Sequence, residues 1–233
     1  MSNSNGIYNG VKETPQTIYD AFNTLMFSED SRVFNKMIKK IEIYNEIRQL
    51  VGDIVEFGVF KGAGLALFLK LTKLNEPHGL TKVIGFDYFK PANTLNELVG
   101  TNKELMENVL KRVTEDELSL TKVKERLELV QNPNFLLFEG EAVTTSKQYY
   151  EMSPGARIKL LYMDLDVGEP TYNILKNLWS RVVPNGIVVF DEYGYHKWDE
   201  SDGVDAFLKE IPGQFKVVNT NIISPTLYIQ KIV

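Results

Sequence analysis

The segment DIVEFGVFKGAG, residues 53–64, decides the fold class of this chain. Its first half is apolar and rich in β-branched side chains, which predicts a short buried strand, and its glycines predict a tight turn. The run LALFLKLTKL (65–74) follows directly and has the composition of a helix. The segment is therefore interpreted as a strand, a glycine turn and a helix.

Four more segments repeat this pattern of short apolar strands with helices between them. They are KVIGFDYF (82–89), NFLLFEGE (134–141), IKLLYMDLD (158–166) and GIVVFDEYG (186–194). Near-continuous apolar strands that alternate with helices predict a parallel sheet covered on both faces, and hence the α/β class. Two short final strands, FKVVNT (215–220) and TLYIQKI (226–232), predict an antiparallel hairpin on that sheet.

The segments outside this pattern are helical in character. We expect residues 1–50 to form a helical extension or lid, and residues 51–233 to form the ligand-binding domain. In the extension, the apolar side of one helix is expected at Phe34, Met37, Ile38, Ile41, Tyr44 and Ile47. Residues 90–133 carry two more helical patterns, and an insertion of this length is usually functional. It is expected to stand over the carboxyl end of the sheet, where open α/β folds bind ligands.

Composition and charge exclude several classes of protein. The 233 residues carry a formal net charge of −5, which gives no reason to expect binding to nucleic acid or to anionic membranes. Cysteine is absent and only His78 and His196 are present, so disulfides, thiol nucleophiles and zinc–thiolate or histidine-rich metal sites are excluded. The N-terminus MSNSNGIYNG has no features of a secretory signal and is expected to fray. A soluble, cytoplasmic protein is expected.

The glycine turn carries a first candidate ligand site, with the pattern Glu56-x-Gly58-x-x-x-Gly62. A dinucleotide fingerprint has Gly-x-Gly-x-x-Gly instead, and a carboxylate inside the turn would repel a pyrophosphate. The same carboxylate can pair with the cationic amino-acid moiety of S-adenosylmethionine, so the pattern favours that cofactor over NAD. Asp87, at the end of the second strand, is placed to accept both hydroxyls of a ribose. The alternatives are a plain packing turn and a solvated acid at a strand end.

Acidic residues end the fourth and fifth strands, as Asp164-Leu165-Asp166 and Asp191-Glu192. Because neighbouring parallel strands end at one edge of a sheet, we expect these carboxylates within a few ångströms of one another. Such crowding is unfavourable unless a cation neutralises it, and Mg²⁺ prefers oxygen ligands. The alternative is that these acids cap helices or point into water. The aromatic loop that follows contains His196, which is either a general base or part of a plain surface loop.

The order of these motifs resembles the macrocin O-methyltransferase-like (TylF-type) family. The motifs that carry the resemblance are VEFGVFKGAG (55–64), GFDYF (85–89), DLDVGEPT (164–171), VPNGIVVFDEYG (183–194) and GVDAFL (203–208). This family consists of class I S-adenosylmethionine-dependent methyltransferases with a Rossmann-like sheet. It includes enzymes that methylate deoxysugars of natural products, often with a bound magnesium ion.

The resemblance implies a role for each matching residue. The cofactor would be held by Glu56, Gly58 and Gly62 at the methionine and ribose, by Asp87 at the ribose hydroxyls, by Gly140 with Glu139 or Glu141 at the adenine, and by Asp164. The metal ligands would be Asp164, Asp191 and Glu192, and the general base would be Asp166. The chain departs from the family at Glu192, where a second aspartate is usual.

Residues and resemblance together predict an S-adenosylmethionine-dependent, magnesium-dependent O-methyltransferase. Its acceptor would be a sugar or another hydroxylated natural product or small molecule, and Asp166 or His196 would take the proton of the attacking hydroxyl. N-methylation of an amino sugar and a non-catalytic S-adenosylmethionine-binding module are the alternatives, while Glu56 disfavours a nicotinamide-dependent oxidoreductase. The expected partner is a small molecule, without nucleic acid or membrane, and the chain could form a homo-oligomer.

Overall fold

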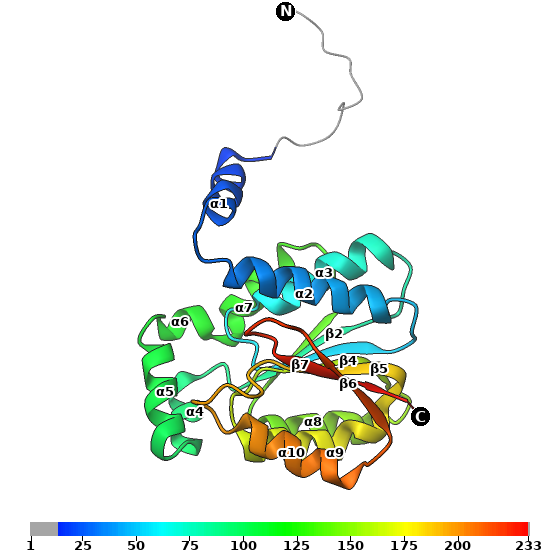
Figure 1. Cartoon of the computed structure of the whole chain (residues 1–233). Coiled ribbons are helices and arrows are strands. Elements are labelled where there is room, and N and C mark those ends of the chain that lie inside the picture. Colours follow the sequence, from blue (N-terminus) through cyan, green and yellow to red (C-terminus); the bar gives the residue numbers. More distant parts are fainter. Residues whose placement is uncertain (1–13, 233) are drawn as a thin grey trace, which may run out of the picture.

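In the computed structural model, seven strands form one sheet between two layers of helices (Figure 1). The structure describes residues 14–232, so the predicted fraying of the first ten residues lies outside the described part. The strands are β1 Asp53–Phe57, β2 Val83–Asp87, β3 Phe135–Glu139, β4 Ile158–Met163, β5 Val182–Phe190, β6 Phe215–Asn219 and β7 Leu227–Lys231. Each of them lies in or overlaps a segment that the sequence predicts to be a strand.

The strands are ordered β3-β2-β1-β4-β5-β7-β6 across the sheet. Strands β1 to β5 pair in parallel, whereas β7 pairs antiparallel with both β5 and β6. The predicted α/β class, with a parallel sheet and a final antiparallel hairpin, is therefore confirmed. The strand order reverses between β1 and β4, and open α/β folds bind ligands at such a reversal.

Helices cover both faces of the sheet, as Figure 1 shows. They are α1 Gln16–Met26, α2 Arg32–Ile47, α3 Ala63–Asn75, α4 Pro91–Glu97, α5 Gly100–Leu110, α6 Glu115–Leu118, α7 Leu120–Glu128, α8 Ala142–Met152, α9 Gly168–Leu178 and α10 Glu200–Glu210. Helices α2 and α3 lie on one face, and α8, α9 and α10 lie on the other. Alternate residues of each strand point to opposite faces. On β4, Leu160 and Tyr162 thus pack on the α2 side, whereas Leu161 and Met163 pack on the α9 side.

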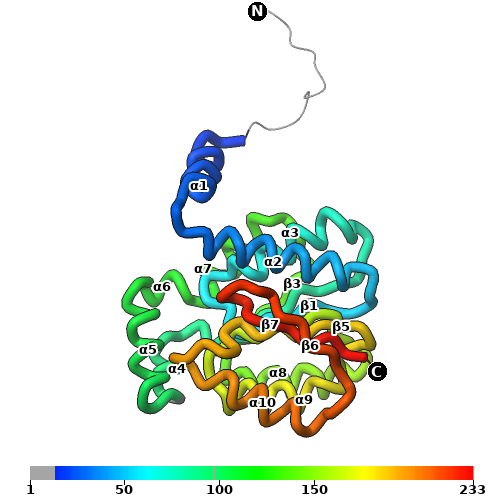
Figure 2. Tube along the Cα trace, in the orientation of Figure 1, coloured from blue at the N-terminus to red at the C-terminus, as the bar shows by residue number. Residues whose placement is uncertain are grey.

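The two N-terminal helices differ in how they meet the rest of the molecule. Helix α1 buries none of its residues and projects away from the sheet (Figure 1). Helix α2 packs on the sheet, and Figure 2 shows it beside the C-terminal strands. Its buried residues are Lys40, Ile43, Tyr44 and Ile47, whereas Ile38 is 37% exposed. The predicted apolar side is therefore correct at Tyr44 and Ile47 and wrong at Ile38, because the helix is rotated towards its lysine side.

The long insertion between β2 and β3 forms helices α4 to α7. The two predicted helical patterns correspond to α5 and to α6 with α7, while the sequence did not indicate the short helix α4. Thr94, Leu98, Asn102 and Met106 of α4, α5 and their connection line a cavity together with strand-end residues of the sheet. The expectation that the insertion stands over the carboxyl end of the sheet is thus confirmed. None of the helices in the described part has the length and apolar character needed to cross a membrane.

Candidate active site

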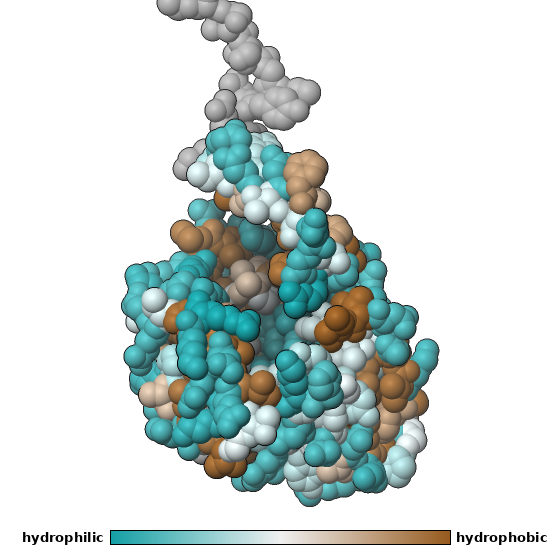
Figure 3. Space-filling model, turned by 60° about the vertical axis from the view of Figure 1, so that its left-hand side comes forward, coloured by the Kyte–Doolittle hydropathy of each residue, from teal (hydrophilic) through white to brown (hydrophobic). Residues whose placement is uncertain are grey.

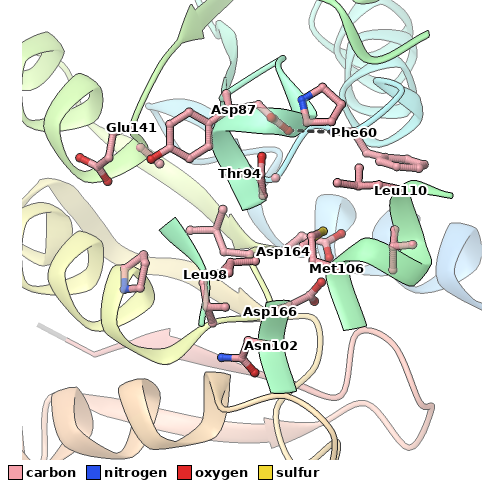
Figure 4. A pocket seen from close by; sticks show the side chains of 18 of the residues that line it. Phe60, Asp87, Thr94, Leu98, Asn102, Met106, Leu110, Glu141, Asp164 and Asp166 are labelled. Atoms are coloured by element: carbon pink, nitrogen blue, oxygen red, sulfur yellow. Dashed lines mark hydrogen bonds between the residues drawn. The ribbon is translucent and has the colours of Figure 1, made fainter. Parts of the chain in front are cut away.

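A cavity of ≈ 740 Å³ opens between the carboxyl ends of the parallel strands and the inserted helices. Figure 3 shows a hollow on this side of the molecule with both hydrophilic and hydrophobic surface around it. The side chains labelled in Figure 4 come from the sheet edge (Phe60, Asp87, Glu141, Asp164, Asp166) and from the inserted helices and their connection (Thr94, Leu98, Asn102, Met106, Leu110). The size and mixed lining are typical of a site for a small molecule.

Gly58, in the turn after β1, lies in the cavity wall. Its φ of 82° is left-handed, and a Cβ atom added to it would lie 1.8 Å from the carbonyl oxygen of Asp164. The Asp164 amide also donates to the Phe57 carbonyl oxygen at 3.0 Å. The chain segments after β1 and β4 therefore approach each other so closely that only glycine fits between them.

Asp87 ends β2 and fixes the backbone around the cavity. Its Oδ2 accepts from the Phe60 amide at 3.0 Å and its Oδ1 accepts from the Phe89 amide at 2.9 Å; Figure 4 draws the bond to Phe60. Burial raises the pKa of Asp87 above its ordinary value, while these backbone hydrogen bonds act in the opposite direction. The backbone amides of Val59 and Tyr88 also contribute hydrogen bonds that favour the charged form of this carboxylate. Asp87 lines the cavity, and its role of accepting ribose hydroxyls stays a prediction.

Gly140 and Glu141 follow β3 and line the same cavity. The Gly140 amide donates to the Asp87 carbonyl oxygen at 3.0 Å, which joins the ends of β2 and β3. The Glu141 carboxylate caps α8, because it accepts from the amides of Val143 and Thr144 at 2.8 and 2.7 Å. Both oxygens thus serve the helix N-terminus. We expect any adenine contact here to come mainly from the backbone rather than from this carboxylate.

Glu56 and Gly62, the other two residues of the glycine pattern, are not among the cavity-lining residues. Glu56 is 2% exposed, and its Oε1 accepts from Lys40 Nζ of α2 at 2.7 Å. The same ammonium lies 3.9 Å from the ring centre of Tyr162. Gly62 packs under α7, where an added Cβ would lie 3.1 Å from Val123. The structure places Glu56 in a buried ion pair and Gly62 under a helix, and their role in cradling the cofactor stays a prediction.

Removing Lys40 should destabilise the fold strongly. Lys40→Met leaves the buried Glu56 carboxylate without its partner, and breaking a buried pair in this way costs about 3–5 kcal/mol. The double variant Lys40→Met/Glu56→Leu removes both charges and should regain most of that free energy of unfolding. Urea unfolding of the wild type and the variants measures both effects. A double variant as unstable as Lys40→Met would show that the cost does not come from the unpaired carboxylate.

At the ends of β4 and β5, a lysine joins two of the predicted acidic residues. Lys36 Nζ of α2 lies 3.1 Å from Asp164 Oδ2 and 2.7 Å from Asp191 Oδ2. Asp191, which is 1% exposed, also accepts from the hydroxyls of Tyr162 at 2.5 Å and Ser224 at 2.6 Å. The expectation that the ends of β4 and β5 bring these acids together is confirmed at Asp164 and Asp191. Asp191 does not line the cavity but lies behind Lys36 and Asp164, which do.

The pKa values of the acids at this edge are shifted in different directions. Burial opposes the charge of Asp191, but Lys36, Lys40 and the hydrogen bonds it accepts hold its pKa below the ordinary value. Burial, followed by the charge of Asp191, raises the pKa of Asp166 to about 7. Burial and the same charge also raise the pKa of Asp164, against the effect of Lys36.

Asp166 lies in the cavity wall with its backbone in the left-handed region, at a φ of 66°. An L residue other than glycine seldom takes this conformation, and such strain clusters at functional sites. Among the described residues, no hydrogen bond or ion pair engages its carboxylate. A carboxyl group with a pKa near 7 and no protein partner is suited to exchange a proton with a ligand.

The residues present do not fit the predicted magnesium site. In the described part of the chain, no group of three or more His, Cys, Asp or Glu side chains could hold a metal ion. An ammonium group lies between Asp164 and Asp191, where the prediction had the cation, and Asp191 is already engaged by two hydroxyls. The third predicted ligand, Glu192, has its carboxyl pKa raised to about 7, mainly by burial and then by Asp166 and Asp191. Lys36 thus offsets the charge of Asp164 and Asp191, whereas the raised pKa values of Asp166 and Glu192 leave both groups partly protonated near pH 7.

His196, predicted as an alternative base, lies outside the cavity. Its side chain is exposed and its nearest aromatic neighbour is Tyr195, at 5.3 Å between ring centres. The chain turns after β5, with the Tyr195 amide donating to the Glu192 carbonyl oxygen at 2.9 Å. The buried Glu200, which sequence reasoning missed, anchors the turn by accepting from the Glu192 amide at 2.9 Å.

Sequence reasoning also missed Lys36 and Lys40. They lie one helical turn apart on α2, so they share one side of the helix. The only signal in the sequence was this four-residue spacing on an amphipathic helix. Since a lysine pair at this spacing is usually solvated, the pattern became informative only when the rotation of α2 was known.

A methyltransferase domain family model matches residues 55–193 of the chain. A search of curated proteins found no match. Solved structures match over nearly the whole chain, at low sequence identity. The calicheamicin methyltransferase CalS11 is 20% identical, with a TM-score of 0.65 over 99% of this chain and 98% of its own. The O-methyltransferase NovP is 16% identical, with a TM-score of 0.70 over 94% of this chain and 100% of its own.

A third similar structure is an O-methyltransferase from Bacillus cereus in complex with SAH. It is 11% identical, with a TM-score of 0.55 over 97% of this chain and 95% of its own. At such identities these likenesses show a shared fold. They agree with the Rossmann-like sheet, its flanking helices and the final antiparallel strand described above.

Proposed function

Since the chain belongs to the methyltransferase domain family and is an S-adenosylmethionine-dependent enzyme, we propose an acceptor for it. The acceptor is a hydroxyl group of a sugar or of another small natural product. The observation that carries the proposal is the position of Asp166 in the cavity wall, with a carboxyl pKa of about 7. An oxygen nucleophile must lose a proton during methyl transfer, and a base with this pKa is matched to neutral pH.

The two parts of the cavity suit the two reactants. S-adenosylmethionine supplies an activated methyl group, so the chain has to bind and align two molecules and accept one proton. Gly58, Asp87 and Gly140 would hold the nucleoside at the ends of β1, β2 and β3. Leu98, Asn102 and Met106 of the insertion would hold the acceptor, with Asp166 between the two parts. The apolar and amide side chains match the mixed surface of a sugar or glycoside.

Two of the similar structures suggest which acceptors to test first. One is described as a TDP-rhamnose 3'-O-methyltransferase of calicheamicin biosynthesis, and NovP is described as an O-methyltransferase. The purified chain should be incubated with S-adenosylmethionine and a panel of nucleotide-linked deoxysugars, half of them with an amino group. Mass spectrometry with fragmentation then locates the added methyl group. We expect methylation of a sugar oxygen.

Two results of that panel would contradict the proposal. Methylation of nitrogen alone would establish the amino-sugar alternative. Bound S-adenosylhomocysteine without transfer to a broad panel of hydroxylated acceptors would favour a binding module.

The rate should depend on pH in the direction set by Asp166. Its raised pKa keeps the carboxyl group protonated in mildly acidic solution, so kcat/KM should rise with pH through about 7. Glu192→Gln is the informative control, because the pKa of Glu192 is also about 7. The rise should persist in this variant. If it disappears there, Glu192 rather than Asp166 is the titrating group.

A further inference from the structure

Lys36 is the one described cation seen to bridge the two carboxylates at the ends of β4 and β5. Its ammonium lies 3.1 Å from Asp164 Oδ2 and 2.7 Å from Asp191 Oδ2, and its side chain is 32% exposed. It also lines the cavity, as does Asp164. The charge therefore lies in the cavity wall and is partly buried.

The surroundings of Lys36 keep it charged. Burial opposes the charge, but Asp164 and Asp191 outweigh this effect and raise the pKa of Lys36 above its ordinary value. The nearby groups are mainly acidic: Asp166, Glu192 and Glu200 face the same cluster of carboxylates. A single positive charge in this setting offsets the repulsion between the carboxylates, as a bound metal cation would.

The rest of α2 holds Lys36 in position. One turn along the helix, Lys40 is buried against Glu56 at 2.7 Å, which fixes the rotation of α2 on the sheet. Beyond it, Tyr44 and Ile47 are fully buried. Asp191 is oriented in turn by the hydroxyls of Tyr162 and Ser224. Both ends of the Lys36–Asp191 contact are thus fixed by packing and hydrogen bonds.

We propose that Lys36 is a built-in replacement for a divalent metal ion, so that this chain neutralises its strand-end carboxylates with its own ammonium group and does not use Mg²⁺. The ammonium holds Asp164 and Asp191 together and leaves Asp166 unpaired and facing the acceptor. Only the statement that Asp166 faces the acceptor rests on the proposed function. Metal binding tests it independently of any methyl transfer.

The test is a titration of metal alone into the full-length chain, using MgCl₂ in calorimetry and Mn²⁺ in electron paramagnetic resonance. The wild type should show no site-specific binding of either ion. Lys36→Ala frees an acidic pair of oxygen ligands, so its affinity for Mn²⁺ should rise by at least about tenfold. Lys39→Ala is the matched control, since Lys39 lies on the same helix and pairs with the surface residue Glu42. It should bind metal no better than the wild type.

Two results would overturn the inference. One is Mg²⁺ binding by the wild type that is lost in Asp191→Asn, because the lysine would then share the site with a metal. The other is unchanged Mn²⁺ affinity in a folded Lys36→Ala. If that variant does not fold, Lys36→Met and the wild-type titration decide the question by the same criteria. Turnover of the wild type should also be the same in EDTA as in Mg²⁺, and a loss of activity in EDTA would count against the inference.

Discussion

Asp166→Asn is expected to lower kcat by about 10²–10⁴-fold, the range that a positioned general base contributes. The amide cannot accept the proton of the attacking hydroxyl. Asparagine is the appropriate replacement, because it tolerates the left-handed backbone at position 166, where φ is 66°. The loss should therefore come from chemistry and not from misfolding. Affinity for S-adenosylhomocysteine should be unchanged, since the nucleoside is expected on the other side of the cavity.

The comparison that isolates this effect is Asp166→Asn against His196→Asn. His196 is exposed and lies outside the cavity, so its replacement should leave kcat unchanged. Single-turnover kinetics with S-adenosylmethionine and the accepted sugar separate the chemical step from product release. Near-normal kcat in Asp166→Asn would remove Asp166 from the role of base. A large loss in His196→Asn would show that the loop after β5 moves into the site.

Gly58→Ala is expected to reduce the free energy of unfolding by about 3–5 kcal/mol, as the most disruptive single substitutions do. The added methyl group would lie 1.8 Å from the carbonyl oxygen of Asp164, on a backbone whose φ is 82°. This clash can be relieved only if the segments after β1 and β4 separate. Both segments border the cavity. For a chain of this size the melting temperature should fall by roughly 10 °C. Cofactor binding should weaken in parallel.

Gly155→Ala is the matched control, because nothing lies within 4 Å of a Cβ atom added at that position. Its melting temperature should stay close to that of the wild type. Differential scanning calorimetry of both variants measures the contrast. If Gly58→Ala melts at the wild-type temperature, the close approach of the two segments is not rigid, and the glycine is not required for it.

The fold and the grouping of strand-end acids could be predicted because both depend on local patterns. Short apolar runs with helices between them predict a parallel sheet, and parallel strands end at one edge. Asp164 and Asp191 are therefore neighbours in the structure as the sequence indicated. The structure also brings Gly140 beside Asp87, at the ends of β3 and β2, whereas the sequence indicated Gly140 only through the family resemblance.

The role of Glu56 could not be predicted from the glycine pattern alone. Strand alternation puts Glu56 on the same side as Ile54, which packs with α2 and α3. Whether a carboxylate on that side meets a cofactor or a helix depends on what α2 carries. It carries Lys40, and the two charges form a buried pair.

The three predicted metal ligands do not assemble into a metal site in the described part of the chain, for a similar reason. The acids were correctly expected to need a cation, but the sequence did not show that a helix more than a hundred residues away in the chain supplies one. The position of Lys36 depends on how α2 is rotated on the sheet, which is a property of tertiary packing. Helical periodicity fixes which residues share a side, and it leaves open which side is buried when lysines and apolar residues alternate.

The cavity at the carboxyl end of the sheet is expected to bind the nucleoside of S-adenosylmethionine. Its most direct test is a calorimetric titration of S-adenosylhomocysteine into the full-length wild type, with EDTA present. We expect saturable binding of one molecule per chain with a micromolar dissociation constant, and the same constant when Mg²⁺ replaces EDTA. Absence of binding under both conditions would show that this cavity is not a site for the cofactor.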